Sequence, residues 1–212
     1  MIPLAPWAVV NDQMPPSGRH LWGCVDGEQV WVFCAHRPDI AAFLLDHGHF
    51  GGDRWSGDRI TRFRLSMPRV MARSSQGQRE GKECIVGLAL RRDAMEQVLR
   101  QAIHWREFPE AHFSTAAQWR LAVRFTQVVL DWAPDSDVSG EDLTRLTPRF
   151  GLRSEALRGL GKDWVLDVQS LDDLAVAWRS GLDEVSTPTM QPLSIPRGCD
   201  QTRLLWDPDA VS

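Results

Sequence analysis

The chain has 212 residues and a net charge of −4, with 43% hydrophobic and 25% charged residues. These proportions are ordinary for a soluble globular protein, and the length allows one domain with a substantial core. No apolar run approaches the roughly 18–20 residues of a membrane span, and the proline-broken N-terminus lacks the basic segment of a signal peptide. We therefore expect a cytoplasmic protein that makes no membrane contact.

Charges of opposite sign are separated along the chain. From Asp53 to Arg106 there are 12 basic and 6 acidic residues, and from Asp131 to Glu184 there are 6 basic and 12 acidic residues. A nucleic-acid-binding domain usually carries its basic excess throughout, so this pattern disfavours that class. It favours a small anionic ligand or a partner of opposite polarity. Arginine supplies 22 of the 24 basic residues, as expected from a GC-rich genome.

Neither the cysteines nor the histidines form a metal-binding pattern. The four cysteines are scattered, without the regular spacing of a zinc site or a disulfide framework. The six histidines include no HExxH motif, and 47-HGH-49 falls where a helix should end. We predict reduced thiols, no metal site and no cofactor.

The first half of the chain predicts alternating strands and helices after an irregular start. Residues 1–27 are rich in proline and glycine and indicate an irregular N-terminal arm. Hydrophobic periodicity and capping residues then predict the following elements: a strand at 28–35, a helix from Pro38 to Gly48, a strand near 60–65, a helix capped by Ser66 with Pro68 in its first turn, a strand at 84–90 and a helix from Asp93 to Ile103.

The second half predicts fewer helices and a proline-rich end. Its expected elements are a strand at 123–132, a strand near 148–152, a helical turn at 154–160, a strand at 164–168, a helix after Ser170 with a stripe that reaches Leu182, and an edge strand at 203–206. No glycine-rich phosphate loop follows the first strand, which argues against a doubly wound sheet. We predict one α+β domain over residues 28–184, with a mixed or antiparallel sheet, followed by a tail at 185–212.

The order of these segments resembles one family, known as domain of unknown function 4291. The corresponding segments are 32-VFCAH-36, Ile40-Ala41, Phe50, 59-RITRFRLSMPRVMARSSQ-76, 85-IVGLAL-90, 131-DWAP-134, 150-FGL-152 and Trp164-Val165. They match family text such as V-Y-Q-A-Y, R-M-T-W-I-K-P-S-F-L-W-M-M-Y-R-S-G-W and Q-W-D-P. The match runs from about Val30 to about Leu182 in unbroken order, and the central segment needs no gap.

The departures from the family pattern fall on aromatic and proton-transferring residues. In the central segment the family's lysine is replaced by Arg64, its tryptophans by Arg62, Arg69 and Gln76, and its tyrosine by Ala72. A guanidinium can hold an anion but cannot relay a proton near neutral pH. The resemblance therefore implies a site that keeps its positive charge and has lost acid/base groups.

We predict an anion-binding pocket built from residues that the family pattern retains, together with Arg64 and His36, which replace its lysine and a tyrosine. Its candidates are Arg59, Thr61, Arg64, Ser66, Arg73 and His36, because the planar fork of arginine suits sulfate, phosphate and carboxylate. The competing interpretation is a solvated or subunit-facing arginine surface. Arg62 and Arg69 stand where the family has tryptophan, and we assign them to an interface together with Trp105 and Trp119.

Two further groups have a catalytic and a structural interpretation. Cys34 and His36 alternate on one strand and could form a nucleophile pair, but no third residue orients them, so a buried thiol beside a pocket histidine is favoured. Asp131 and Asp135 could serve acid/base work, although a strand-terminating turn explains them equally well. No catalytic residue is assigned on these patterns.

Three functions remain open on the sequence. The first is an accessory subunit that forms a heterodimer with a catalytically intact paralogue; the chain is similar to the paired subunits that close an aziridine ring by expelling sulfate in azinomycin-type antibiotic biosynthesis. The second is a self-sufficient enzyme for a small phosphorylated, sulfated or nucleotide-like substrate, with a fold like that of ADP-ribosyltransferases. The third, a nucleic-acid or scaffold protein, rests only on the arginines.

Overall fold

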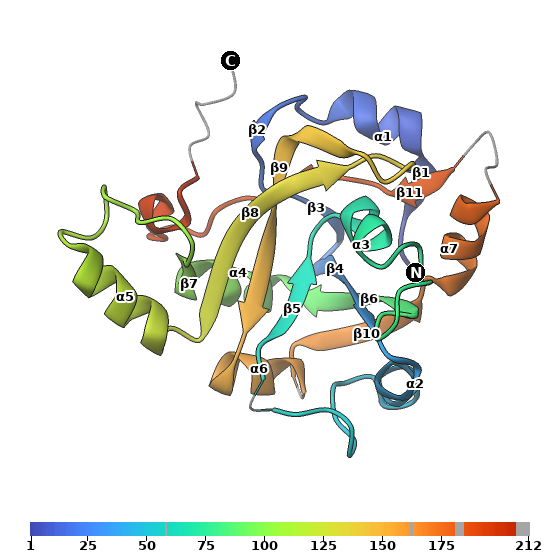
Figure 1. Ribbon diagram of the computed structural model, residues 1–212, viewed down its shortest axis with the longest axis horizontal. Coiled ribbons are helices and arrows are strands. Elements are labelled where there is room, and N and C mark those ends of the chain that lie inside the picture. The colour runs from blue at the N-terminus through green and yellow to red at the C-terminus, as the bar shows by residue number, and fades with distance from the viewer. Residues whose placement is uncertain (58, 162, 181–184, 207–212) are drawn as a thin grey trace.

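A mixed β-sheet runs through the centre of the computed structural model, which describes residues 1–206 apart from 58, 162 and 181–184 (Figure 1). The strands are β1 (Leu4–Pro6), β2 (Gly18–Arg19), β3 (Trp22–Asp26), β4 (Gln29–His36), β5 (Thr61–Arg64), β6 (Cys84–Arg91), β7 (Ala102–His104), β8 (Val128–Ser136), β9 (Asp142–Leu152), β10 (Val165–Ser170), β11 (Ser186–Pro188) and β12 (Gln191–Pro192). The helices are α1 (Trp7–Gln13), α2 (Pro38–His47), α3 (Met67–Arg73), α4 (Arg92–Gln101), α5 (Ala116–Phe125), α6 (Ser154–Leu160), α7 (Asp172–Arg179) and the 3₁₀ helix η1 (Gln201–Leu204).

The main sheet has the strand order β10-β6-β4-β5-β9-β8-β7. Most neighbouring strands are antiparallel, while β7 pairs with β8 and β2 with β9 in parallel. This is the mixed α+β domain that the segment pattern predicts. Among the described residues, no helix is both long and apolar enough to cross a membrane.

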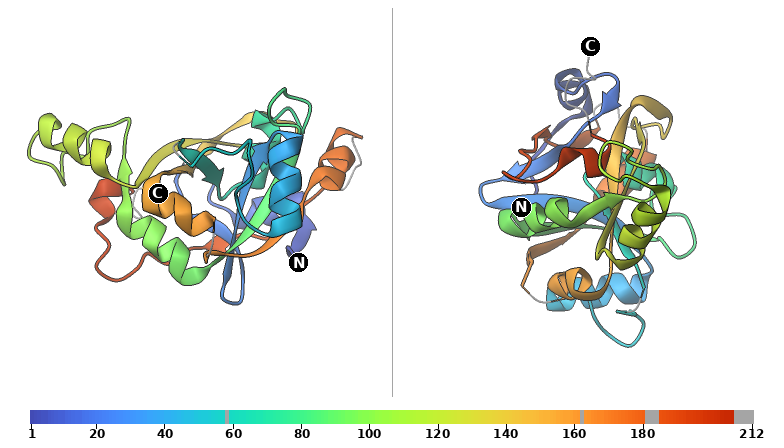
Figure 2. Two further views of the ribbon diagram at one scale, coloured as in Figure 1. Left: turned by 90° about the horizontal axis from the view of Figure 1, so that it is seen from below. Right: turned by 90° about the vertical axis from the view of Figure 1, so that its left-hand side faces the viewer.

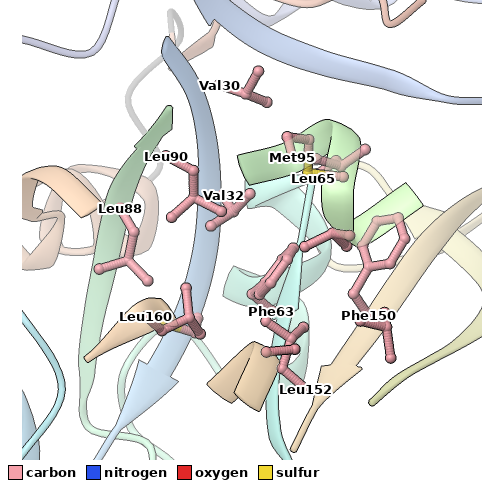
Figure 3. Packing of buried hydrophobic residues seen from close by; sticks show 14 of the residues in the cluster. Val30, Val32, Phe63, Leu65, Leu88, Leu90, Met95, Phe150, Leu152 and Leu160 are labelled. Atoms are coloured by element: carbon pink, nitrogen blue, oxygen red, sulfur yellow. The ribbon is translucent and has the colours of Figure 1, made fainter. Parts of the chain in front are cut away.

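Both faces of the sheet are covered at β4 and β6, so the interiors of these two strands are apolar throughout rather than alternating. Along β4, Val30, Val32 and Cys34 belong to one core cluster, whereas Trp31 and Phe33 belong to the other. Helices α2, α4 and α6 pack on the first face, and α3 and α7 pack on the second (Figure 2). Figure 3 shows how side chains of β4, β5, β6 and β9 converge in the larger cluster.

The ends of the central helices follow their capping residues. The Ser66 side chain accepts a hydrogen bond from the Arg69 amide at 3.2 Å, as the predicted N-cap of α3. Helix α2 ends at Gly48, which has a φ of +71°, a left-handed conformation that glycine adopts at little cost. The predicted starts and ends of α2, β5, α3 and β6 agree with the structure to within about two residues, the usual uncertainty of element boundaries.

Residues 1–27, expected to be irregular, contain β1, α1, β2 and β3. Their regularity comes from distant pairing: β1 pairs with β11, and β12 pairs with β3. The N-terminal segment also packs on the sheet, since a Cβ added at Gly87 would lie 2.7 Å from Ile2. The proposed arm and tail therefore contact each other and the main body, which local sequence patterns do not report.

Two predicted strands are wrong in position or type. The strand expected from residue 123 begins at Val128, because α5 occupies 116–125; its N-cap Thr115 accepts a hydrogen bond from the Gln118 amide at 3.2 Å. The strand expected at 203–206 is replaced by η1, whose N-cap Asp200 accepts a bond from the Thr202 amide at 2.9 Å. The helix after Ser170 ends at Arg179, and Leu182 of its predicted stripe lies outside the described residues.

Candidate functional site

A cavity of about 620 Å³ opens beside the ends of β4 and β5. Its wall combines these two strands with α3, β9, the segment after α2 and the segment that precedes β6. The predicted residues that line it are His36, Arg59, Thr61, Arg64 and Arg73. Basic residues also present in the wall are Arg37, Arg54, Arg62, Lys82 and Arg149. Asp53 is the one acidic residue among the described residues of the wall, so the cavity is strongly cationic.

Arg64 is the most deeply buried cation of this cavity. It lies on β5 between Phe33 of β4 and Arg149 of β9, and only 8% of its surface is exposed. Its Nη1 atom is buried and has no hydrogen-bond partner among the described residues. Burial, followed by the positive charges of Arg149 and Arg69, lowers the pKa of Arg64 to about 9. The side chain is therefore charged at pH 7 and incompletely bonded.

Arg149, opposite Arg64, is held by Asp131 of β8. Its Nε and Nη2 atoms donate to the two carboxylate oxygens at 2.8 and 2.5 Å. The Arg106 Nε atom lies 3.0 Å from the Oδ2 atom of the same carboxylate. This bidentate geometry fixes the orientation of Arg149 at the cavity wall. Asp131 thus acts as the anchor of a cavity arginine.

Two arginines of α3, Arg69 and Arg73, lie one turn apart and differ in their surroundings. Arg73 is exposed and lines the cavity. Arg69, assigned to an interface, is 8% exposed and donates to Ser136 at 2.8 Å and to Asp142. Ser66, assigned to the anion pocket, lies outside the cavity lining and donates its hydroxyl to Asp135. Ser66 and Arg69 therefore belong to a polar cluster within the chain.

Cys34 and His36 both line the cavity from β4. Burial raises the pKa of the Cys34 thiol to about 12, so it is protonated at neutral pH and a weak nucleophile. Burial and the charge of Lys82 lower the pKa of His36 to about 4. His36 Nε2 is buried and unbonded within the described chain, and its ring packs edge-on against Phe50 at 5.3 Å. His36 is thus a neutral polar group facing a cationic cavity.

Asp131 and Asp135 lie within β8 and do not form a carboxylate pair. Asp131 binds Arg149 and Arg106, while Asp135 accepts from Arg145 Nε at 2.9 Å. Both are almost fully buried. The strand continues to Ser136 because it pairs with β9 along this length, so neither residue ends it. Their environment supports a structural function.

The two tryptophans assigned to an interface lie just after β7 and within α5. Trp105 and Trp119, the interface candidates, are partly buried. The Trp119 indole donates to the His104 carbonyl at 2.7 Å, and the Arg106 guanidinium lies 5.2 Å from the Trp105 ring centre. Arg62, the fourth interface candidate, is exposed and lines the cavity.

Sequence reasoning missed Arg149 and Lys82 as cavity residues. Arg149 comes from β9, and its place depends on long-range strand pairing with β5. Lys82 precedes β6 in a polar segment that looks like a linker; its one signal is rarity, because Lys162 is the only other lysine. Among the described residues, no group of His, Cys, Asp and Glu could hold a metal ion.

Comparison with known families identifies the family to which the chain belongs. The model of Domain of unknown function (DUF4291) matches residues 20–197, which include the whole cavity wall. The chain is a member of the DUF4291 family. No curated protein matches the chain significantly.

Proposed function

We propose that the cavity binds a small anionic ligand, and that the chain does so as the accessory subunit of a heteromeric biosynthetic enzyme. The observation that carries the proposal is Arg64: a buried guanidinium with an unbonded Nη1 on a wall that has a large surplus of positive charge. A buried charge without a partner is costly, and an oxyanion would satisfy it. The volume of about 620 Å³ is typical of small-molecule sites.

The resemblance to aziridine-forming subunits makes departing sulfate the first anion to test. Fixed guanidinium donors stabilise negative charge that develops on a leaving group. The residues supplied by the central segment hold charge and have no proton to exchange near pH 7. Chemistry that needs a base would then come from the partner subunit.

A thermal-shift and calorimetric comparison tests the anion site. Sulfate and phosphate should stabilise the wild type, and Arg64→Ala should weaken their binding by at least about tenfold, since a hydrogen bond to a charged group is worth about 1.5–3 kcal/mol. Arg64→Lys should recover part of the binding because it restores a point charge. Arg158→Ala, an exposed arginine outside the cavity wall, is the matched control. Equal binding by Arg64→Ala and wild type would refute the site.

The exposed apolar side of α5 supports the subunit role. None of the α5 residues is buried, and Leu121 and Phe125 are 57% and 71% exposed. They lie four residues apart and therefore share one side of the helix, which projects from the body of the molecule (Figure 1). Such a face suits contact with another protein. A paralogue encoded nearby is the partner that we propose.

Size-exclusion chromatography of the mixed proteins tests this partner. Leu121→Asp with Phe125→Asp should abolish the complex. Val176→Asp, which alters an equally exposed side chain on α7 at the opposite end of the molecule, should leave it intact. Failure of the wild-type chain to form any complex with the paralogue would reject the subunit role and leave the anion site to be judged separately.

A self-sufficient enzyme for a phosphorylated, sulfated or nucleotide-like substrate is the second candidate. Lys82 favours it, because a lysine in the cavity supplies a titratable amine that Arg64 cannot. Thermal-shift screening against NAD, nucleotides, sulfate and phosphate separates the candidates. A large shift with NAD and none with sulfate would favour the enzyme with an ADP-ribosyltransferase-like fold.

A further inference from the structure

Lys82 is a primary amine in a wall whose other basic groups are guanidinium or imidazole. It lies just before β6 and lines the same cavity as Arg64, Arg73 and Arg149. If the cavity required only positive charge, another arginine would serve, as it does at the other basic positions of the wall. An amine differs from a guanidinium in one chemical respect: it can lose a proton near neutral pH and attack a carbonyl carbon.

The segment that carries Lys82 is fixed by local hydrogen bonds. The Lys82 amide donates to the Arg79 carbonyl at 2.9 Å, and the Arg79 amide donates to the Ser74 carbonyl at 2.9 Å. The Glu83 carboxylate accepts from the Gly81 amide at 2.8 Å. These bonds involve residues that precede and follow Lys82 in the chain. Its side chain thus starts from a defined position at the cavity wall.

The surroundings of Lys82 shift its amine toward the neutral form. Within the described residues, no ion pair or hydrogen bond engages its ammonium group. Partial burial, followed by the positive charges of Arg79, Arg73, Arg64 and Arg149, lowers the pKa of Lys82. His36, which is affected by the same ammonium charge, is neutral at pH 7. The cavity therefore places a primary amine of lowered pKa beside guanidinium groups that can hold an anion.

We propose that Lys82 captures an anionic aldehyde or ketone as an imine, with the arginines of the cavity holding the ligand's phosphate, sulfate or carboxylate group. This inference rests on the anion site proposed above. The lone pair of Nζ attacks the carbonyl carbon, the π electrons move to oxygen, and that oxygen gains a proton released by the nitrogen. The carbinolamine then loses its hydroxyl and the remaining nitrogen-bound hydrogen as water, which leaves a C=N bond. No oxidant or reductant is required.

Reductive trapping with pyridoxal 5′-phosphate, used as a probe aldehyde that carries a phosphate, tests the proposal on the full chain. After borohydride reduction, peptide mass spectrometry should find Lys82 labelled at least tenfold more than Lys162 or the amino terminus. Phosphate should compete with the labelling, and pyridoxal, which lacks the phosphate, should label Lys82 at least tenfold less. Labelling spread equally over the three amines would overturn the proposal.

Variants separate this inference from the anion site itself. Lys82→Arg keeps the charge and should abolish the selective labelling while retaining sulfate-dependent stabilisation; Lys162→Arg should leave labelling unchanged. Arg64→Ala should reduce labelling by pyridoxal 5′-phosphate much more than labelling by pyridoxal, which should fall only through the smaller effect of the Arg64 charge on the pKa of Lys82. If sulfate stabilises the chain and Lys82 is not labelled, the imine proposal fails and the anion site stands. If sulfate does not bind and both aldehydes label Lys82 equally, the anion site fails, and the substrate class fails with it.

Discussion

Two groups of arginines, each of which includes a residue of α3, differ in their partners. In the paired cluster, formed by Ser66, Arg69, Asp135, Asp142 and Arg145, each arginine binds a carboxylate. In the cationic cavity around Arg64, the only acidic group on the wall within the described residues is Asp53. One nitrogen of Arg69 and one of Arg145 also lack a partner, but their charges are compensated by carboxylates.

The contrast shows that residue type alone does not tell whether an arginine stabilises the fold or lines the cavity. Arg69 and Arg73 are one helical turn apart, yet Arg69 stabilises the fold and Arg73 faces the cavity. The compensated charges contribute to the structure of the free chain. The uncompensated charges at the cavity make the free chain less stable than a neutral wall would, and an anion would offset this cost.

The largest expected effect is the loss of a carboxylate from the paired cluster. Asp135→Asn should reduce the free energy of unfolding by about 3–5 kcal/mol, because it leaves Arg145 buried without a counter-charge. Urea unfolding measures this change. Glu155→Gln is the control: Glu155 and its partner Arg158 are both exposed, so we expect a loss below about 1 kcal/mol. Equal losses for the two variants would show that burial does not distinguish these pairs.

A second variant shifts a cavity arginine from compensated to uncompensated. Asp131→Asn should lower the free energy of unfolding by about 3 kcal/mol and release Arg149 and Arg106 from their shared carboxylate. Sulfate should then bind about three- to tenfold more tightly, because a nearby negative charge is gone. Calorimetry at a temperature where the variant is folded measures the affinity. Weaker binding would mean that the orientation of Arg149 matters more than its net charge.

The cavity should also respond to pH through His36. Its folded-state pKa of about 4 lies below the usual value of 6.5, so the unfolded chain binds more protons between these values and stability falls as the pH is lowered through that window. The shift corresponds to about 3 kcal/mol. Urea unfolding of His36→Phe between pH 6.5 and pH 4 should show a smaller loss than the wild type. Parallel curves for both proteins would contradict this assignment.

Local patterns predicted the central fold because its causes are local, whereas Arg59, Arg64 and Arg73 follow as site candidates only from the family resemblance. The Ser66 cap, the Gly48 end of α2 and the apolar run of β4 depend on neighbouring residues, and the structure confirms them. The pairing of residues 1–27 with the C-terminal segment depends on contacts across more than 160 residues. Arg149 and Lys82 likewise reach the cavity through tertiary structure, so spacing in the sequence does not reveal them.

Selenate soaked into a crystal of the protein tests whether Arg64 binds an anion, because anomalous scattering locates the selenium atom wherever the anion lies. We expect a selenate within hydrogen-bond distance of Arg64 Nη1 in the wild type, and its loss in Arg64→Ala. Selenate found only at exposed arginines outside the cavity, with none at Arg64, would refute the anion site.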